Sequence, residues 1–217
     1  MSTPQEVLKK ITATPWIDNG KTDEEKRIQI AFHFKEIMST LGMDLTDDSL
    51  IETPKRVAKM FVDEVFYGLN PKNFPKVTCV ENKMGYTGMV LEANITLNSN
   101  CEHHFVPIIG KAHIAYIPKG KVIGLSKLNR IVAYFGARPQ IQERLTKQVM
   151  EMLQGLLETE DVAVVIDGIH TCVKTRGIKD GSSITRTPCL GGVFKEEGPL
   201  RAEFYSSIPK VNEINFN

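Results

Sequence analysis

The chain has 217 residues and a mass of 24.3 kDa, and its 27 basic and 26 acidic side chains give a formal net charge of +1. Its 41% hydrophobic and 24% charged residues are typical of a globular protein with one substantial core. The near-zero charge excludes a dedicated nucleic-acid binder, which carries a basic excess. No apolar run approaches the ~20 residues that span a bilayer, and residues 1–6 lack the features of a signal peptide. We therefore expect a cytoplasmic protein with reduced cysteines and with neither nucleic acid nor membrane as a partner.

The N-terminal part predicts an arm followed by a helix. Residues 1–20 contain two prolines and an Asn-Gly pair, which is typical of an arm with one short helix. Thr22 and Glu25 are spaced as a capping box and start a helix. Apolar residues follow at helical spacing, and Gly42 is placed to end the helix.

A second helix is expected next. Thr53 has the side chain of an N-cap, Pro54 suits the first helical position, and Gly68 marks the end. The two helices define an N-terminal helical subregion that, with the arm, covers residues 1–75.

From Lys76 the pattern changes to strands. Residues 77–83 and 89–97 are rich in β-forming side chains, and the intervening 85–88 (GYTG) predicts a hairpin between them. Residues 111–117 predict a third strand that Pro118 ends.

Two helices and two strands follow. Ser126 is expected to cap one helix, and a longer helix should follow Pro139. Residues 162–166 return to a strand pattern that can continue through Cys172, and the Ser/Thr alternation over 183–187 predicts a short last strand. This order indicates an α+β fold, with a catalytic domain over residues 76–208 and a tail over 209–217.

Two short windows bring cysteine and histidine together. Cys101 and His104 are separated by two residues, a spacing at which a turn presents both to one metal ion. If 170–172 is a strand, His170 and Cys172 point to the same face. Thiolate and imidazole ligands favour zinc. The sequence therefore predicts a zinc site.

The ligand count decides between two kinds of zinc site, and spacing alone leaves both open. A structural site has four protein ligands. If only Cys101, His104 and Cys172 bind, a fourth position stays free for water, and His103 and His170 remain as acid–base groups. His33 and His113 have no cysteine nearby in the sequence, and we interpret them as structural.

Basic residues lie between these windows in the sequence. Lys127 and Arg130 share a face near the start of the helix that Ser126 caps, and Arg176 follows Cys172 closely. A metal centre beside a basic patch of this size suggests hydrolysis of a nucleotide.

Four segments together resemble the motifs of GTP cyclohydrolase I, in its bacterial zinc-dependent form. They are 101–107 (CEHHFVP), 122–132 (VIGLSKLNRIV), 138–146 (RPQIQERLT) and 170–177 (HTCVKTRG). The resemblance extends over roughly residues 22–208 and includes 53–60 (TPKRVAKM).

The resemblance implies the reaction and its catalytic residues. The family converts GTP and water to formate and 7,8-dihydroneopterin triphosphate, the first step toward tetrahydrofolate. Cys101, His104 and Cys172 would hold one zinc ion per subunit, which activates the water that attacks C8 of guanine. His170 would protonate N7, and His103 would assist ring opening.

The resemblance also implies the substrate contacts. Glu143, with Gln142, would bind the guanine edge and discriminate against adenine. The triphosphate would be held by Lys127, Arg130 and Arg176, with Arg56 and Lys59 contributing across a subunit boundary. Ser126 would act at the ribose end during the later rearrangement.

The family fold is a tunnelling α+β fold, an antiparallel sheet with helices on one face. Neighbouring subunits complete its barrel, usually in a toroidal decamer with active sites at the interfaces, so we expect a homo-oligomer. No long N-terminal extension precedes the motifs, and control by a regulatory partner protein is therefore not expected. Cys79, Pro188 and Cys189 receive no role.

Two other functions are compatible with parts of the pattern. A cysteine-nucleophile enzyme of the same fold group, such as a nitrile reductase, needs one activated thiol and no metal, which leaves His104 and the second cysteine unexplained. A binding module with a structural zinc ion would unfold on chelation, whereas a catalytic site would leave a folded apoprotein.

Overall fold

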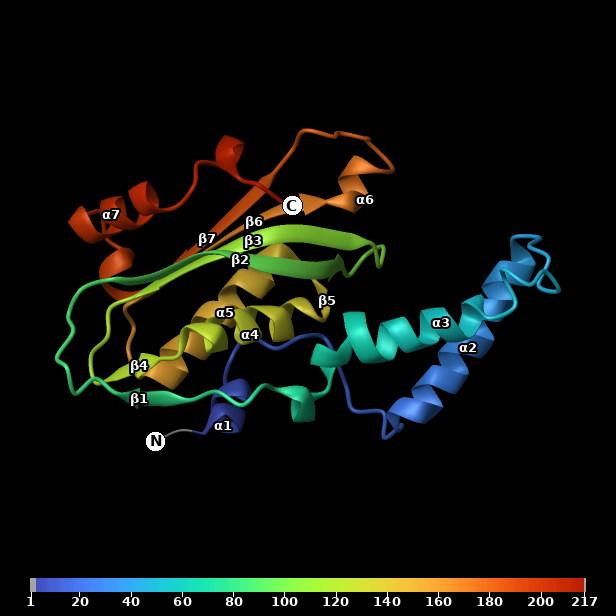
Figure 1. Cartoon of the computed structure of the whole chain (residues 1–217), viewed down its shortest axis with the longest axis horizontal. Helices are drawn as coiled ribbons and strands as arrows, with labels where there is room; N and C mark the ends of the chain where they lie inside the picture. The colour runs from blue at the N-terminus through green and yellow to red at the C-terminus, as the bar shows by residue number, and fades with distance from the viewer. Residues whose placement is uncertain (1–2, 217) are drawn as a thin grey trace.

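The computed structural model describes residues 3–216 and contains a curled five-stranded sheet (Figure 1). The strand order is β5-β2-β3-β6-β7, and every neighbouring pair is antiparallel except β2 with β5. The strands are β2 (Val90–Cys101), β3 (Pro107–Tyr116), β5 (Pro139–Gln140), β6 (Val162–His170) and β7 (Thr185–Leu190). The third and last predicted strands are therefore confirmed, and the chain has the expected α+β character.

The predicted hairpin around residues 85–88 is wrong. β1 (Cys79–Glu81) pairs with β4 (Lys121–Ile123) in a separate two-stranded sheet and not with β2. The Asn82 side chain explains the loop between β1 and β2, because its amide donates to the Tyr86 carbonyl and its Oδ1 accepts from the Tyr86 N–H. This closes a local loop, after which the chain crosses to the large sheet.

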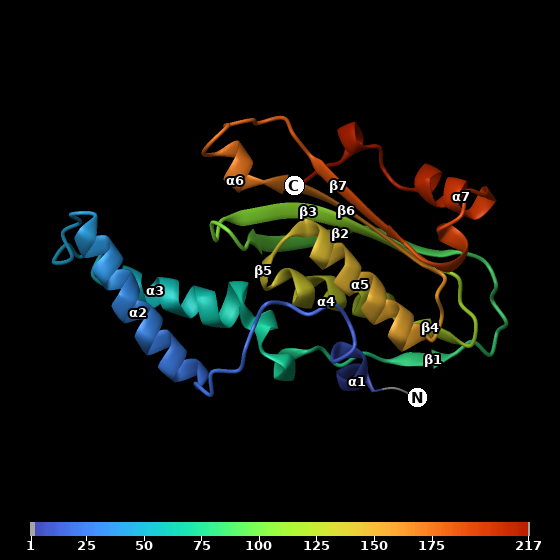
Figure 2. The ribbon, with the colours of Figure 1, turned by 180° about the vertical axis from the view of Figure 1, so that it is seen from behind.

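Helices cover one face of the large sheet. α4 (Leu125–Gly136) and α5 (Gln142–Leu157) lie side by side beneath it (Figure 1), and their apolar faces form the main core with the inward residues of β2, β3 and β6. The predicted cap of α4 is wrong by two residues, because Gly124 is the N-cap and Ser126 lies within the first turn. The opposite face carries α7 (Pro199–Ser207), which packs Phe204 against Phe194 and the outward residues of β6 (Figure 2).

Two of the N-terminal helices, α2 (Asp23–Thr40) and α3 (Thr53–Lys59), form an arm that projects beyond the sheet (Figures 1 and 2). α1 (Pro4–Leu8) contacts α5 within the body, and α2 pairs with α3 in the projecting hairpin. The capping box of Thr22 and Glu25 is confirmed. Thr53, in contrast, is the first helical residue, and Glu52 is the N-cap, whose side chain makes no capping hydrogen bond.

The chain after α3 does not continue as an α-helix to Gly68. A π-helical segment spans Met60–Val65, and a 3₁₀ turn at Tyr67–Leu69 follows it. Further 3₁₀ turns lie at Pro71–Asn73, Gly192–Phe194 and Val211–Glu213. Within residues 3–216, no helix combines the length and apolarity that crossing a membrane requires.

Candidate metal centre and active site

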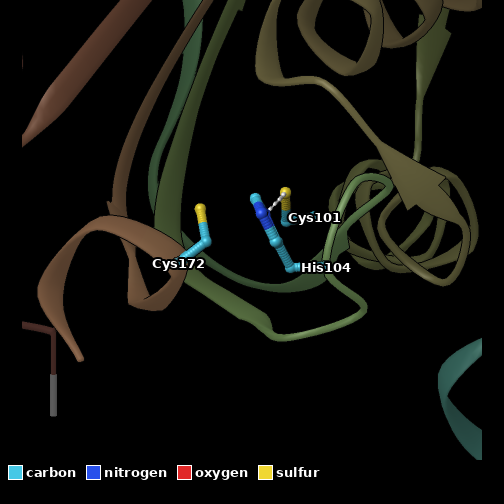
Figure 3. A group of neighbouring side chains, drawn as sticks. All are labelled: Cys101, His104 and Cys172. Atoms are coloured by element: carbon cyan, nitrogen blue, oxygen red, sulfur yellow. Dashed lines mark hydrogen bonds between the residues drawn. The ribbon is translucent and has the colours of Figure 1, made fainter. Parts of the chain in front are cut away.

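Cys101 and His104 meet at a tight turn that ends β2. The Cys101 N–H donates to the Val106 carbonyl at 2.9 Å, and the Phe105 N–H donates to the Cys101 carbonyl at 2.9 Å. Phe105 adopts the left-handed conformation with a φ of 53°, which turns the chain back into β3. The turn directs the Cys101 thiol and the His104 ring to the same point (Figure 3), with Nδ1 of His104 3.8 Å from Sγ of Cys101.

Cys172 reaches this point from another part of the chain, but not along a strand. β6 ends at His170, and a helical turn, α6 (Thr171–Lys174), follows directly. The Thr171 hydroxyl donates to the Pro107 carbonyl at 2.6 Å and holds this turn against the start of β3. The sequence thus predicted the meeting of Cys172 with Cys101 for the wrong reason, because a strand would have directed Cys172 to the same face as His170.

These three side chains have the geometry of a metal site. Their ligand atoms all lie within 4.8 Å of one another, and among the described residues this group contains His104 but not His103. In a tetrahedral zinc site the bond lengths of about 2.3 Å to sulfur and 2.0 Å to nitrogen place two such ligand atoms about 3.6 Å apart. The observed 3.8 Å between Cys101 Sγ and His104 Nδ1 fits that spacing. Three protein ligands leave a coordination position for water or substrate.

The pKa of Cys172 reflects its burial and its position beside Cys101. Burial, and then the neighbouring Cys101 thiol, raise the pKa of Cys172. Without a bound cation two adjacent thiolates repel each other, and a divalent cation between them would remove this repulsion.

His103 also faces Cys101, with its Nδ1 3.9 Å from Cys101 Sγ, and it lies beside an ion pair that the sequence did not reveal. Its side chain is 64% exposed, and its Nε2 is 3.7 Å from Oε1 of Glu102. Arg144 on α5 donates to both Glu102 oxygens, at 2.7 and 3.3 Å. These hydrogen bonds lower the pKa of Glu102. This ion pair connects the metal-binding turn to the start of α5. In the sequence, the two residues are marked only by their positions inside the segments 101–107 and 138–146.

His170 contacts the first residue of α5. Its Nε2 lies 2.8 Å from Oε1 of Gln142. Burial lowers the pKa of His170, and the nearby Glu143 carboxylate opposes this effect. Glu143 itself is exposed and makes no hydrogen bond or ion pair with any residue of the described range.

The Gln142 side chain, for which the resemblance implies a contact with the guanine edge, is turned into the protein. The residue is 2% exposed. Its Nε2 contacts Ile166 O, Thr185 O and Thr187 Oγ1, and its Oε1 contacts His170. Its amide is therefore occupied within the chain.

Arg176 adjoins the metal-binding turn. Its Nη1 lies 2.7 Å from Nε2 of His104, the ring nitrogen opposite the one that faces Cys101. The guanidinium is exposed, and a guanidinium group can donate hydrogen bonds to carboxylate or phosphate oxygens. The structure thus places one of the predicted basic residues at the metal centre.

The other predicted basic residues lie far from the centre in the same chain. Asn129, which sits between Lys127 and Arg130 on α4, donates to Glu92 at 3.3 Å. Glu92 precedes Cys101 by nine residues along β2, which corresponds to roughly 25–30 Å of strand. Figure 1 shows the same separation, because β4 and the start of α4 lie at the opposite end of the sheet from β5, which pairs with Cys101. Ser126, Lys127 and Arg130 are therefore not part of the site formed by their own chain.

Arg56 and Lys59 lie on the projecting arm. Both are exposed on α3, and neither contacts the metal-binding turn. The segment that follows them does reach it, because Phe61 and Phe66 stack against Phe105 with ring centroids 6.3 and 5.2 Å apart.

The two histidines interpreted as structural differ from each other. His33 is exposed on α2, with its ring against Phe32. His113 is fully buried, and its Nε2 lies 3.3 Å from Asp167, which also accepts two hydrogen bonds from Arg186. This pairing of His113 with Asp167 could not be predicted from the sequence, because Asp167 is on another strand. Burial alone would raise the pKa of Asp167, but the contacts with His113 and Arg186 hold it below its ordinary value.

Comparison with known proteins agrees with this geometry. The sequence model of a family described as GTP cyclohydrolase I matches residues 30–209. The chain belongs to the GTP cyclohydrolase I family. It is 56% identical over 204 residues, 94% of each chain, to a GTP cyclohydrolase 1 of Vibrio vulnificus strain YJ016. It is also 57% identical over 195 residues, 90% of each chain, to that of Vibrio cholerae.

A further relative of the same name comes from Shewanella sp. strain ANA-3, with 56% identity over 191 residues and 88% of each chain. Among solved structures, the apo form of an archaeosine synthase described as QueF-Like aligns with 48% of this chain and 95% of its own at a TM-score of 0.40 and 18% identity. The family match favours the cyclohydrolase over the two alternatives considered from the sequence, the cysteine-nucleophile enzyme and the binding module.

Proposed function

We propose that the chain is a zinc-dependent GTP cyclohydrolase I that converts GTP and water to formate and 7,8-dihydroneopterin triphosphate in the cytoplasm, as the first step toward tetrahydrofolate. The observation that carries the proposal is the three-ligand centre of Cys101, His104 and Cys172, with His170 and Glu143 beside it. The family membership supports the reaction.

Cys101, His104 and Cys172 would hold the zinc ion, which supplies a Lewis acid that brings the pKa of a water molecule toward ~7. His170 ends β6, two residues before Cys172, and we assign it the proton transfer to guanine N7. Burial lowers the pKa of His170, which favours the neutral ring, and a neutral imidazole can accept a proton and return it. His103 is exposed, with its Nδ1 3.9 Å from Cys101 Sγ, and would serve the later ring opening.

Glu143 would select guanine. Its carboxylate is free at the start of α5 and can accept two hydrogen bonds, from N1–H and the 2-amino group. Adenine lacks both donors at these positions, so its edge would leave the carboxylate unpaired. The expected signature is that Glu143→Gln loses selectivity for GTP over ATP, with KM for GTP rising at least tenfold.

Arg176 would bind the triphosphate in its own chain. An arginine only donates, so its contact with His104 requires a lone pair on Nε2. When Nδ1 ligates a cation, the neutral imidazole carries its proton on Nε2, and Arg176 is then repelled and free to turn to the phosphates.

Lys127 and Arg130 would reach the same substrate only from a neighbouring subunit, since Asn129 between them contacts Glu92, nine residues before Cys101 along β2. This supports a homo-oligomer, a toroidal decamer by resemblance, in which neighbouring sheets complete the barrel. Ser126 would act from the same neighbour, and Arg56 and Lys59 would extend from the projecting arm of another.

Complementation tests this composite site. His170→Ala and Arg130→Ala should each be inactive alone, whereas their co-expression should restore about a quarter of wild-type turnover, because half of the chains carry each intact part. A site contained in one chain would leave the mixture inactive. A mixture of His170→Ala with Glu143→Ala is the control and should remain inactive, because both residues belong to the same half-site.

Turnover of GTP tests the function itself. The purified protein should release formate and yield a fluorescent pterin after oxidation of the product. Absence of both products from zinc-loaded protein would refute the proposed function.

A further inference from the structure

Gln142 has an orientation that its neighbours determine. It is the first residue of α5, and its Nε2 lies 2.9 Å from both the Ile166 and the Thr185 carbonyl oxygens. Carbonyl oxygens only accept hydrogen bonds, so the atom that faces them must be the amide nitrogen. The Gln142 oxygen therefore faces the other way, toward His170.

A chain of hydroxyl groups supports the same assignment. Thr146 Oγ1 donates to the Gln142 backbone carbonyl at 2.8 Å, which uses its only proton. In its 2.6 Å contact with Thr187 Oγ1, Thr146 must then accept, so Thr187 donates. Thr187 is left with a lone pair for Gln142 Nε2, 3.1 Å away. Each donor and acceptor in this chain has one consistent assignment.

The orientation of Gln142 determines the protonation of His170. Gln142 Oε1 lies 2.8 Å from His170 Nε2 and can only accept, so Nε2 must carry a proton. A neutral imidazole has one N–H, which leaves Nδ1 as the ring nitrogen with a free lone pair.

Gly168 provides the space for this contact. A Cβ at that position would lie 2.5 Å from Gln142 Oε1, so any other residue would displace the amide. Gly168 is on β6, two residues before His170. The strand is thus locally adapted to the amide that contacts His170.

We propose that Gln142 is a positioning residue that holds neutral His170 in its Nε2–H tautomer and leaves Nδ1 as the nitrogen that exchanges a proton with the substrate. The catalytic consequence of this inference rests on the proposed function, whereas the tautomer of His170 is independent of it. Positioning replaces direct guanine binding as the role of the Gln142 side chain.

The tautomer can be measured directly. Magic-angle-spinning NMR of zinc-loaded protein with ¹⁵N-labelled histidine should show a protonated Nε2 and an unprotonated Nδ1 for His170, assigned by the signal lost in His170→Asn. Gln142→Met removes the acceptor without adding charge, and a mixture of tautomers is expected. The matched control is Gln148→Met, which removes another buried glutamine of α5 that contacts Gln140 and Thr12 and should leave the His170 signals unchanged.

Kinetics separates positioning from substrate binding. Gln142→Met should lower kcat about 10- to 100-fold, the loss expected for a misplaced acid–base group, and change KM for GTP less than about threefold. Gly168→Ala leaves Gln142 present but displaces its amide, and it should also lower kcat. This second variant tests the inference even if Gln142→Met fails to fold.

The outcomes distinguish the inference from the proposed function. A wild-type His170 protonated on Nδ1, or a tautomer unchanged in Gln142→Met, would overturn the inference even if GTP is turned over. A rise in KM with kcat preserved would also overturn it and would favour a direct guanine contact. The expected tautomers in a protein without GTP turnover would uphold the positioning of His170 and refute only the proposed function.

Discussion

Arg144→Gln should destabilise the protein by removing both hydrogen bonds to Glu102 while retaining much of the side-chain stem. The Arg144 and Glu102 side chains are 13% and 23% exposed, so the pair lies between a surface ion pair and a buried one. Exposed pairs contribute 0.2–1 kcal/mol, and charge-assisted hydrogen bonds in protected sites about 1.5–3. We expect a loss of about 2 kcal/mol, which corresponds to a fall in Tm of roughly 4–8 °C for a chain of this size.

Thermal unfolding monitored by circular dichroism, at fixed protein and zinc concentrations, measures this loss. Lys147→Gln is the matched control, because it breaks an exposed pair with Glu151 on the same helix and should cost at most about 0.5 kcal/mol. Arg144 lowers the pKa of Glu102, so its contribution is present above the unfolded pKa of Glu, ~4.3, and is lost as the pH falls through the folded value. Equal Tm values for Arg144→Gln and Lys147→Gln at pH 7 would refute this account of the pair.

Three further predictions concern other parts of the molecule. Asp167→Asn should lower the free energy of unfolding by about 3 kcal/mol in urea titrations at pH 7, since it leaves Arg186 without its carboxylate. The difference in stability between wild type and variant should shrink below about pH 4, because the folded pKa of Asp167 is lowered. An unchanged difference at pH 3 would contradict this. Gly110→Ala should cost about 1–3 kcal/mol in the same assay, because its Cβ would lie 2.5 Å from the Asp167 carbonyl oxygen, and wild-type stability would show that the strands can separate freely. Cys189→Ser should keep full zinc content by mass spectrometry, because Cys189 is on β7 and outside the ligand group, whereas loss of zinc would make it a ligand.

The ligand residues of the metal centre could be predicted from the sequence because local spacing carries most of the information. The turn that joins Cys101 to His104 is a short-range feature, and two residues of separation suffice to bring the side chains together. The grouping of Cys172 with Cys101 and His104 was predicted correctly, but the helical turn that presents Cys172 depends on the Thr171 contact with Pro107, which is 64 residues away. Such a contact leaves no periodic signal in the sequence.

Long-range pairings explain the errors in the fold. β1 and β2 are adjacent in the sequence and have strand composition, yet β1 pairs with β4. Composition indicates that a segment is a strand, but not which partner supplies its hydrogen bonds. The same limitation placed Lys127 beside the metal centre in the sequence, although the length of β2 separates them in the chain.

The burial of Gln142 is another feature that the sequence does not reveal. A glutamine before a glutamate at a helix start is compatible with two substrate ligands or with one ligand and one buried contact. The Gln142 amide donates to the carbonyl oxygens of Ile166 and Thr185, which lie on two other strands, and these contacts are the basis of the positioning role proposed above.

Zinc titration of metal-depleted protein tests the central claim most directly. Formate release from GTP should be absent after chelation, while the far-UV circular dichroism stays native because the core is formed without the metal centre. Activity should then rise linearly with added zinc and level off at one ion per chain, and Cys172→Ser should not respond. Full formate release from protein that contains no zinc would contradict the account.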